Sequence, residues 1–222
     1  MRLQPYCSGY GCDVGFGGDP INELAIRIDL PQPYAVTGDL APQLGGDCRD
    51  LKWFRDGVLD FVYSSHVLED FQDTETESIL REWTRVLKVG GRIVLLLPDQ
   101  IRYLQHCAKT GETTNPHHAI PHFSLSYIRE TAKRISELKF LAGEDINNDY
   151  SFYIVLEKAI TVGENGPADG HIRQQLETTL EQNRRLQQEN LSLKHQLGRI
   201  RENPLVAPLL KIRAAIKAAF QK

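Results

Sequence analysis

Two short segments near the start of the sequence carry residues suited to holding a small ligand. The first is a glycine-rich turn, DVGFG at residues 13–17, which follows a short strand predicted over residues 10–14. Glycines at the end of a strand let the backbone approach a ligand closely and adopt positive φ angles. The second is Asp29, which ends a strand predicted over residues 25–30, where a carboxylate can accept hydrogen bonds from ribose hydroxyls. Each feature alone also fits an ordinary turn at a strand end.

The spacing of the four cysteines does not indicate a metal site. Cys7 and Cys12 lie close together but no matching pair follows them, while Cys48 and Cys107 stand alone. Structural zinc sites are usually built from two closely spaced pairs of ligands. We therefore predict four reduced thiols and no bound metal.

The elements that must position the candidate residues are clearest in the middle of the sequence. Residues 58–63 and 93–97 are mostly apolar, which predicts two buried strands. Between them, Thr74 and Glu77 form a predicted capping box, and the helix is expected to end at the glycine pair 90–91. One face of this helix is apolar, at Ile79, Leu80, Trp83, Val86 and Leu87. Strand, helix and strand with short turns predict a right-handed parallel βαβ unit.

The remaining elements are shorter. Only residues 15–24 separate the first two predicted strands. A parallel crossover usually takes about a dozen residues or more, so the usual first helix is expected to be a turn or absent. A third short strand is expected before Gly45 or around Asp47, Ser124 is a predicted helix cap, and residues 149–158 predict a closing strand.

Composition excludes several broad functions. The sequence has 222 residues, 41% of them hydrophobic and 25% charged, and its net charge is only −3, so there is no global electrostatic case for nucleic-acid binding. No apolar run approaches the ~20 residues of a membrane-spanning helix. Met1 is followed by Pro5 and not by an apolar stretch, so a secretory signal is not expected. We expect a cytoplasmic protein.

Changes of pattern divide the sequence into four parts. Residues 1–162 are expected to form the globular domain, and the glycine-containing residues 163–170 a linker. Residues 171–202 carry a heptad repeat, mostly leucine or isoleucine at d with two asparagines at a, which favours a parallel coiled coil and a homodimer over a single solvated helix. Residues 203–222 predict a basic amphipathic helix, which would lie on the inner face of an anionic membrane, dock on a partner protein, or pack on the coil.

A longer set of motifs resembles a known family. The glycine turn, Asp29, GDC at residues 46–48, SSHVLE at residues 64–69 and EWTRVLKVGG at residues 82–91 occur in the order found in class I S-adenosylmethionine-dependent methyltransferases. A later stretch is similar to a bacterial branch of that family often associated with cell-surface glycan synthesis, and its matching residues are Pro98, Asp99, Tyr103, Gly111, Asn115, Pro116 and His117. The resemblance covers roughly residues 9–160.

The resemblance implies a fold, an activity and a cofactor. The fold would be a doubly wound, mostly parallel, Rossmann-like methyltransferase sheet of seven strands, with S-adenosylmethionine across the carboxyl ends of the strands. The predicted glycine turn and Asp29 lie at such strand ends, where open α/β sheets bind ligands. The acceptor would be a sugar or glycan intermediate of cell-surface polysaccharide synthesis.

The resemblance also assigns cofactor-binding roles by position. Asp13 would support the turn, and Gly15 and Gly17 would admit the methionine part. Asp29 would hold the ribose, and the remaining cofactor contacts would come from Asp47 and Cys48 at the adenine edge and from Ser64, Ser65 and His66 beside the sulfonium. For the last three residues, a plain exit from a strand is the alternative.

A long loop after the central strands supplies candidate catalytic residues. Residues 111–122 contain His117, His118 and His122, and they show no hydrophobic periodicity. Transfer to a hydroxyl acceptor would benefit from a general base, for which histidine is the usual choice. We take His117 and His118 as the candidates, and hydrogen-bonded loop histidines as the alternative.

Two other functions remain open. A methyltransferase-like scaffold without catalysis would bind partners or membrane through the coil and the tail. A nicotinamide-dependent enzyme is disfavoured, because no strand precedes Gly9 and no helix is expected after Gly17. Binding of S-adenosylmethionine distinguishes the enzyme from the scaffold.

Overall fold

The computed structural model describes residues 3–32, 40–147 and 149–160, together with residues 178, 181–182 and 185. The chain divides into two compact units, Met1–Thr161 and Val162–Lys222. The predicted linker and amphipathic tail lie outside the described residues, as does the predicted coiled coil apart from a few helical positions. The strands and helices named below all belong to the first unit.

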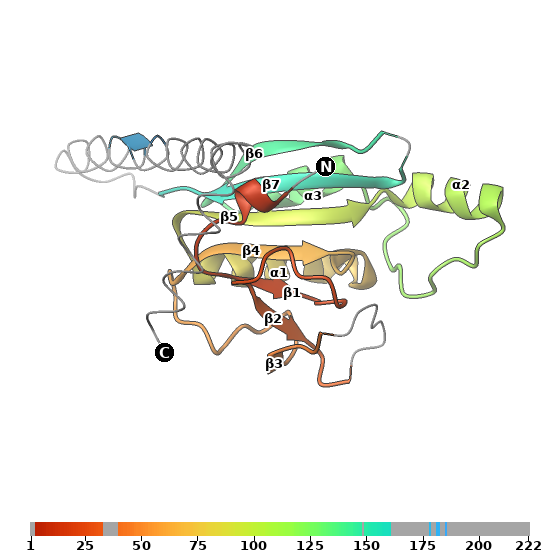
Figure 1. Cartoon of the computed structure of the whole chain (residues 1–222). Helices are drawn as coiled ribbons and strands as arrows, with labels where there is room; N and C mark the ends of the chain where they lie inside the picture. The colour runs from red at the N-terminus through yellow and green to blue at the C-terminus, as the bar shows by residue number, and fades with distance from the viewer. Residues whose placement is uncertain are drawn as a thin grey trace, which may run out of the picture. The chain divides into compact units, whose positions relative to one another are not determined.

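Seven strands of the first unit form one sheet (Figure 1). Their order is β3-β2-β1-β4-β5-β7-β6, and only β7 runs antiparallel to its neighbours. This confirms the predicted Rossmann-like, mostly parallel sheet. The strands are β1 Gly11–Val14, β2 Ile26–Asp29, β3 Leu44–Gly45, β4 Leu59–Ser65, β5 Leu87–Pro98, β6 Leu138–Asp145 and β7 Ser151–Lys158.

The predicted central βαβ unit is present. Helix α1 (Asp73–Val86) connects β4 to β5, and the two strands pair in parallel. The helix is capped by Gln72, which forms a capping box with Glu75, so the predicted box at Thr74 and Glu77 is wrong. Both pairs of residues have the same spacing within one helical turn, and spacing alone cannot choose between them.

The glycine pair 90–91 does not end α1, contrary to the prediction. The helix ends at Val86, and β5 begins at the next residue. Gly90 has a φ of +79° inside β5, close to the point where the pairing with β4 shifts register between Leu59 and Phe61. An irregularity of this kind favours a residue that adopts positive φ cheaply, which explains the glycine.

The two faces of the sheet are covered differently. Helices α1 and α3 (Leu125–Lys133) pack on one face, where Trp83 and Ile128 join the larger core cluster. On the other face, a smaller cluster joins Phe61 and Val94 to the N-terminal segment around Leu3. Helix α2 (Gln100–Thr110) lies beyond the carboxyl end of β5 (Figure 1).

Two crossovers lack helices within the described part of the chain. Between β1 and β2, and between β3 and β4, the chain forms only turns and loops. The expected loss of the first crossover helix is therefore confirmed, and the second helical layer of a doubly wound sheet is not seen among the described residues. No helix in this part of the chain is long and apolar enough to cross a membrane.

Trp83 ties α1 to the loop after β3, which yields a stability prediction. Its ring is fully buried, and its indole N–H donates a 2.8 Å hydrogen bond to the backbone carbonyl of Cys48. Trp83→Phe leaves that carbonyl without its donor, so we expect the free energy of unfolding to fall by about 2 kcal/mol. Urea unfolding of the whole chain measures this, with Trp53→Phe, at a partly exposed tryptophan, as the control. An equal loss of free energy of unfolding in Trp83→Phe and Trp53→Phe would contradict the prediction.

Candidate functional site

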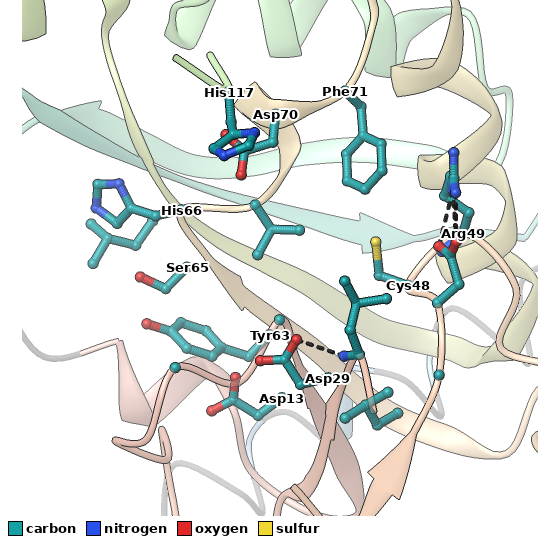
Figure 2. Close-up of a pocket in the computed structure, with 18 of the residues that line it drawn as sticks. Asp13, Asp29, Cys48, Arg49, Tyr63, Ser65, His66, Asp70, Phe71 and His117 are labelled. Atoms are coloured by element: carbon teal, nitrogen blue, oxygen red, sulfur yellow. Dashed lines mark hydrogen bonds and ion pairs between the residues drawn. The ribbon is translucent and has the colours of Figure 1, made fainter. Parts of the chain in front are cut away.

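A cavity of about 630 Å³, called the first cavity, opens at the carboxyl ends of β1, β2 and β4. The turn after β1, the end of β2, the loop after β3 and the exit of β4 all contribute to its wall (Figure 2). The structure thus brings together segments that lie far apart in the sequence. The predicted cofactor residues that line it are Asp13, Gly15, Gly17, Asp29, Asp47, Cys48, Ser65 and His66.

The glycines of the turn line the cavity with backbone atoms, because they have no side chains. Gly15 has a φ of +73°, and a Cβ atom there would lie 2.1 Å from Cγ2 of Val67. Any other residue would therefore clash as well as being strained. The backbone N–H groups of Gly15 and Phe16 donate to the carbonyl of Ile28, at 2.9 and 3.1 Å, which anchors the turn to β2.

Asp13 is the first residue of the glycine turn, and its side chain contacts the segment that follows the turn. Its side chain is buried, and one carboxyl oxygen accepts a 3.0 Å hydrogen bond from the backbone N–H of Ile21. Burial raises the pKa of this carboxyl to about 7; the Ile21 hydrogen bond opposes the shift, and repulsion from Asp19 and Asp29 adds to it. The side chain therefore holds the segment that replaces the first crossover helix.

Asp29 lies at the end of β2 with its carboxyl at the cavity wall. One oxygen accepts a 2.7 Å hydrogen bond from the N–H of Leu30, and burial raises the pKa of the group. Its backbone carbonyl accepts from the N–H of Gly46 at 2.8 Å, which fixes the loop after β3 beside it. The position fits the predicted contact with a ribose.

The loop after β3 carries a charged cluster that the sequence did not reveal. Arg49 bonds the carboxylate of Asp47, with its shortest contact at 2.6 Å, and reaches Glu75 of α1 at 2.9 Å. The Arg49 hydrogen bond lowers the pKa of Asp47. Next to it, burial raises the pKa of the Cys48 thiol to about 12, so this sulfur stays protonated and acts as an apolar wall.

Ser64 does not line the cavity, unlike the other predicted cofactor residues. It is fully buried, and its hydroxyl donates a 2.9 Å hydrogen bond to the backbone carbonyl of Val14. Neighbouring residues of a strand point to opposite faces, so Ser65 takes the position at the cavity wall. Ser64 joins β4 to β1 from within the core.

His66 leaves β4 in an unusual backbone conformation. Its φ is +54°, and it is the only non-glycine residue with positive φ in the described part of the chain. Such a conformation costs about 1 kcal/mol and is often found at functional positions. Its backbone N–H donates to the carbonyl of Leu96 at 2.9 Å, and its Nδ1 lies 3.4 Å from a carboxyl oxygen of Glu69.

The two predicted catalytic histidines differ in position. His117 lines the first cavity, whereas His118 does not. The His118 side chain is almost completely buried, its Nδ1 forms a 2.8 Å hydrogen bond with the side-chain oxygen of Gln100, and burial lowers its pKa. His118 therefore fixes the loop, and its backbone neighbour Ala119 adds a 2.8 Å hydrogen bond to the carbonyl of Glu69.

Several lining residues were not predicted. They come from the wall opposite the glycine turn and from the strands below, where the sequence showed only core or loop positions. The sequence signal at Phe71 is the clearest one that was missed, because an aromatic residue soon after the end of a strand can line a ligand site. The Arg49 guanidinium lies over the Phe71 ring, with 5.3 Å from its central carbon to the ring centroid. The unpredicted lining residues are Asp19, Ile28, Leu30, Gly46, Arg49, Tyr63, Val67, Asp70, Phe71 and Leu96.

A second cavity of about 500 Å³ adjoins the first. His66 and Leu96 line both, so they form the boundary between them. Its other walls come from the N-terminal segment, α2 and the turn between β6 and β7. The remaining lining residues are Leu3, His106, Ile146, Asp149, Tyr150, Ser151 and Tyr153.

Comparison with known proteins bears on the activity. Residues 21–95, which include β2 to β4, α1 and most of β5, match the family model described as a methyltransferase domain. No curated protein sequence matches the chain. The family match supports the methyltransferase activity that the sequence predicts and, with it, the predicted cofactor S-adenosylmethionine.

Solved structures agree in fold. A SAM-dependent methyltransferase from Archaeoglobus fulgidus is 18% identical, with 71% of this chain and 90% of that chain covered and a TM-score of 0.52. An O-methyltransferase family protein from Burkholderia thailandensis is 14% identical, with 72% and 54% covered and a TM-score of 0.51. A protein of echinomycin biosynthesis, described for converting a disulfide bond into a thioacetal group, is 15% identical, with 78% and 83% covered and a TM-score of 0.53.

The first cavity suits the cofactor in charge as well as in place. Of the lining residues that the structure describes, five are aspartates (Asp13, Asp19, Asp29, Asp47 and Asp70) and one is an arginine. S-adenosylmethionine carries a positive sulfonium, which an acidic wall attracts. Within the described residues, no cluster of side chains is arranged to hold a metal ion.

The raised pKa of Asp13 predicts how stability depends on pH. The folded protein holds this proton up to about pH 7, whereas an unfolded chain releases it near about pH 4. The free energy of unfolding therefore falls as the pH rises through this window. Asp13→Asn, which cannot ionise, should gain about 1–3 kcal/mol relative to the original chain between about pH 5 and about pH 8. Denaturant unfolding of both proteins at the two pH values measures this gain. If the free energy of unfolding changed equally with pH in both proteins, the prediction would be contradicted.

Proposed function

We propose that this methyltransferase binds S-adenosylmethionine in the first cavity and transfers the methyl group to a hydroxyl of a sugar or glycan intermediate. The observation that carries the proposal is the meeting of the glycine turn, Asp29, Asp47 and the exit of β4 around one cavity at the carboxyl edge of the sheet. This is where open α/β sheets bind ligands. The sugar acceptor is supported by the resemblance of the segment between Pro98 and His117, and its place in cell-surface polysaccharide synthesis belongs to the same proposal.

The cofactor would lie along the cavity from the glycine turn to Phe71. The methionine part would rest on the backbone of Gly15 and Gly17, where no side chain intervenes. The ribose hydroxyls would donate to the Asp29 carboxylate. The adenine would lie towards Cys48 and Phe71, whose apolar surfaces form that end of the cavity (Figure 2).

The charge of the first cavity argues against a nicotinamide cofactor. A dinucleotide carries a pyrophosphate with negative charge, and its usual site is the N-terminus of a helix after the first strand. No helix follows β1 in the described residues, and aspartates line the cavity instead. Bringing a pyrophosphate to this wall would place like charges together.

The proposed cofactor contact with Asp29 gives a binding prediction. Asp29→Asn removes a charged acceptor for two ribose hydroxyls, so we expect the affinity for S-adenosylmethionine to fall by about 10- to 100-fold. Calorimetric titration of the whole chain measures this. The matched control is Asp50→Asn, because Asp50 is exposed, pairs with Lys52 at 3.3 Å and does not line the cavity.

Two outcomes of this titration would count against the proposal. Unchanged affinity in Asp29→Asn would remove the ribose contact from the proposed site. No binding of S-adenosylmethionine by the folded original chain would instead favour the non-catalytic scaffold.

The proposal includes a homodimer. The heptad pattern of residues 171–202, which lies almost wholly outside the described residues, supports a parallel coiled coil. The basic amphipathic pattern of residues 203–222 supports an attachment to an anionic membrane surface or to a partner protein, and a cytoplasmic enzyme held at the inner membrane face would satisfy both.

The heptad pattern predicts which substitution breaks the dimer. Leu186 and Leu193 occupy d positions of successive heptads. Gln188 occupies the outer f position of the heptad that contains Leu186. Leu186→Asp places a charge among the apolar d positions, where the two helices would meet, so we expect this full-length variant to elute as a monomer. Gln188→Asp changes an outer position, so we expect that variant to elute as a dimer. Light scattering after size-exclusion chromatography measures both masses. A dimer that survives Leu186→Asp together with Leu193→Asp would refute the coil.

A further inference from the structure

His66 stands at the boundary between the two cavities. Among the described residues it is the only titratable one that lines both of them, and its one companion there is the apolar Leu96. In Figure 2 its ring lies at the side of the first cavity away from Phe71 and Arg49. A group placed there can touch a molecule in the second cavity while staying close to the cofactor.

A buried carboxylate orients the His66 ring. Glu69 is only 2% exposed, and its Oε1 lies 3.4 Å from Nδ1 of His66. The other oxygen, Oε2, is buried and has no hydrogen-bond partner in the described part of the chain. A carboxylate behind one ring nitrogen fixes the orientation of the imidazole, which leaves the other nitrogen to accept a proton.

The second cavity has the chemistry of a pocket for a neutral, hydroxyl-bearing ring. The Tyr150 ring lies 5.0 Å from His106 and 6.3 Å from His66, in tilted and edge-on arrangements that form an aromatic wall. Asp149 and Ser151 add hydrogen-bonding groups. No lysine or arginine occurs among the described residues that line the cavity, so nothing there matches a phosphate or carboxylate.

We infer that the second cavity is the acceptor pocket, that His66 is the general base of the transfer, and that Glu69 is its positioning residue. This inference rests on the proposed binding of S-adenosylmethionine in the first cavity. It assigns the base to His66 in place of His117 and His118. His117 lines only the first cavity, and His118 is buried against Gln100.

The step balances without any further reactant. The acceptor hydroxyl gives its proton to the free ring nitrogen of His66 as its oxygen attacks the methyl carbon of the sulfonium. The carbon–sulfur bond breaks, and its electron pair stays on sulfur, which yields S-adenosylhomocysteine and a methyl ether. The imidazolium then releases its proton to water. Transfers of this kind depend mainly on alignment of the reacting atoms, with a base adding to the rate.

The backbone conformation of His66 provides a suitable variant. Asparagine tolerates positive φ better than most residues, so His66→Asn removes the base and keeps the strand exit. The matched control is His122→Asn, since His122 packs against Tyr127 and lines neither cavity. His122→Asn should bind S-adenosylmethionine with the affinity of the original chain to within about threefold. Because His66 also lines the first cavity, kcat of His66→Asn is measured at saturating S-adenosylmethionine.

The experiment uses the full chain, radiolabelled S-adenosylmethionine and three neutral probes: methyl glucopyranoside, methyl rhamnopyranoside and catechol. We expect a neutral probe to bind the protein loaded with S-adenosylhomocysteine, detected by saturation-transfer NMR. A sugar phosphate, added as a charged control probe, should not bind. Tyr150→Ala should abolish this binding. His66→Asn should lower kcat by about 100-fold or more with little change in KM, and His122→Asn should leave it unchanged.

Glu69→Gln tests the positioning role separately. The titratable groups near His66 are Glu69, Asp149, Tyr150 and His118. Loss of the Glu69 carboxylate should lower kcat and leave KM and the affinity for S-adenosylmethionine unchanged, because the ring is no longer held in place. Glu69→Asp, which keeps a carboxylate, should restore part of kcat. A purely structural role would weaken both binding affinities as well, and Glu69→Asp would then restore nothing.

The outcomes separate the inference from the proposed function. No binding of S-adenosylmethionine by the original chain would refute the proposed function itself. Binding of the cofactor with no neutral probe bound or methylated would overturn the acceptor pocket. Full turnover by His66→Asn would overturn the assignment of the base.

Discussion

The hydrogen bond from the Ser64 hydroxyl to the Val14 carbonyl joins β4 to β1 where both strands end. It is buried, and it lies at the last pair of the parallel register, in which Val14 is opposite Ser64. The glycine turn leaves β1 directly after Val14, and His66 leaves β4 shortly after Ser64. The spacing of these two exits therefore sets the width of the first cavity. Close pairing is also enforced at Gly11, where a Cβ would lie 2.4 Å from the Phe61 ring.

The order of most elements was predictable because it depends on local hydrophobic patterns, whereas β6 was not predicted from the sequence. Runs of β-branched and aromatic residues marked β4, β5 and β7, and the short stretch before Asp29 marked a crossover without a helix. The errors came from signals that fit two structures equally. Two pairs of residues had capping-box spacing, and the start of α1 at Asp73 makes Gln72 the cap. The glycine pair before Arg92 fits a helix end as well as the irregular start of a strand.

Site residues were predictable where they lie at the end of a strand. They were not predictable where the direction of a side chain depends on tertiary packing. Gly15, Asp29 and Ser65 line the cavity because parallel strands end at one edge of the sheet. The side chain of Ser64 points into the core, as strand alternation requires. Arg49 gave no signal, because its role depends on a contact with α1. Glu69 belongs to the SSHVLE motif, but its role depends on burial behind His66, which the motif does not indicate. Such contacts join residues whose separation in sequence carries no pattern.

The uneven covering of the sheet determines where acceptor selectivity would arise. Without helices at two crossovers, the N-terminal segment covers the second face, and Leu3 both joins the smaller core cluster and lines the second cavity. Across that cavity, the turn between β6 and β7 supplies Asp149 and Tyr150. Loops of this kind tolerate sequence change better than strand ends. Because His66 separates the two cavities, the acceptor pocket can change its lining while the strand ends that would hold the cofactor stay fixed.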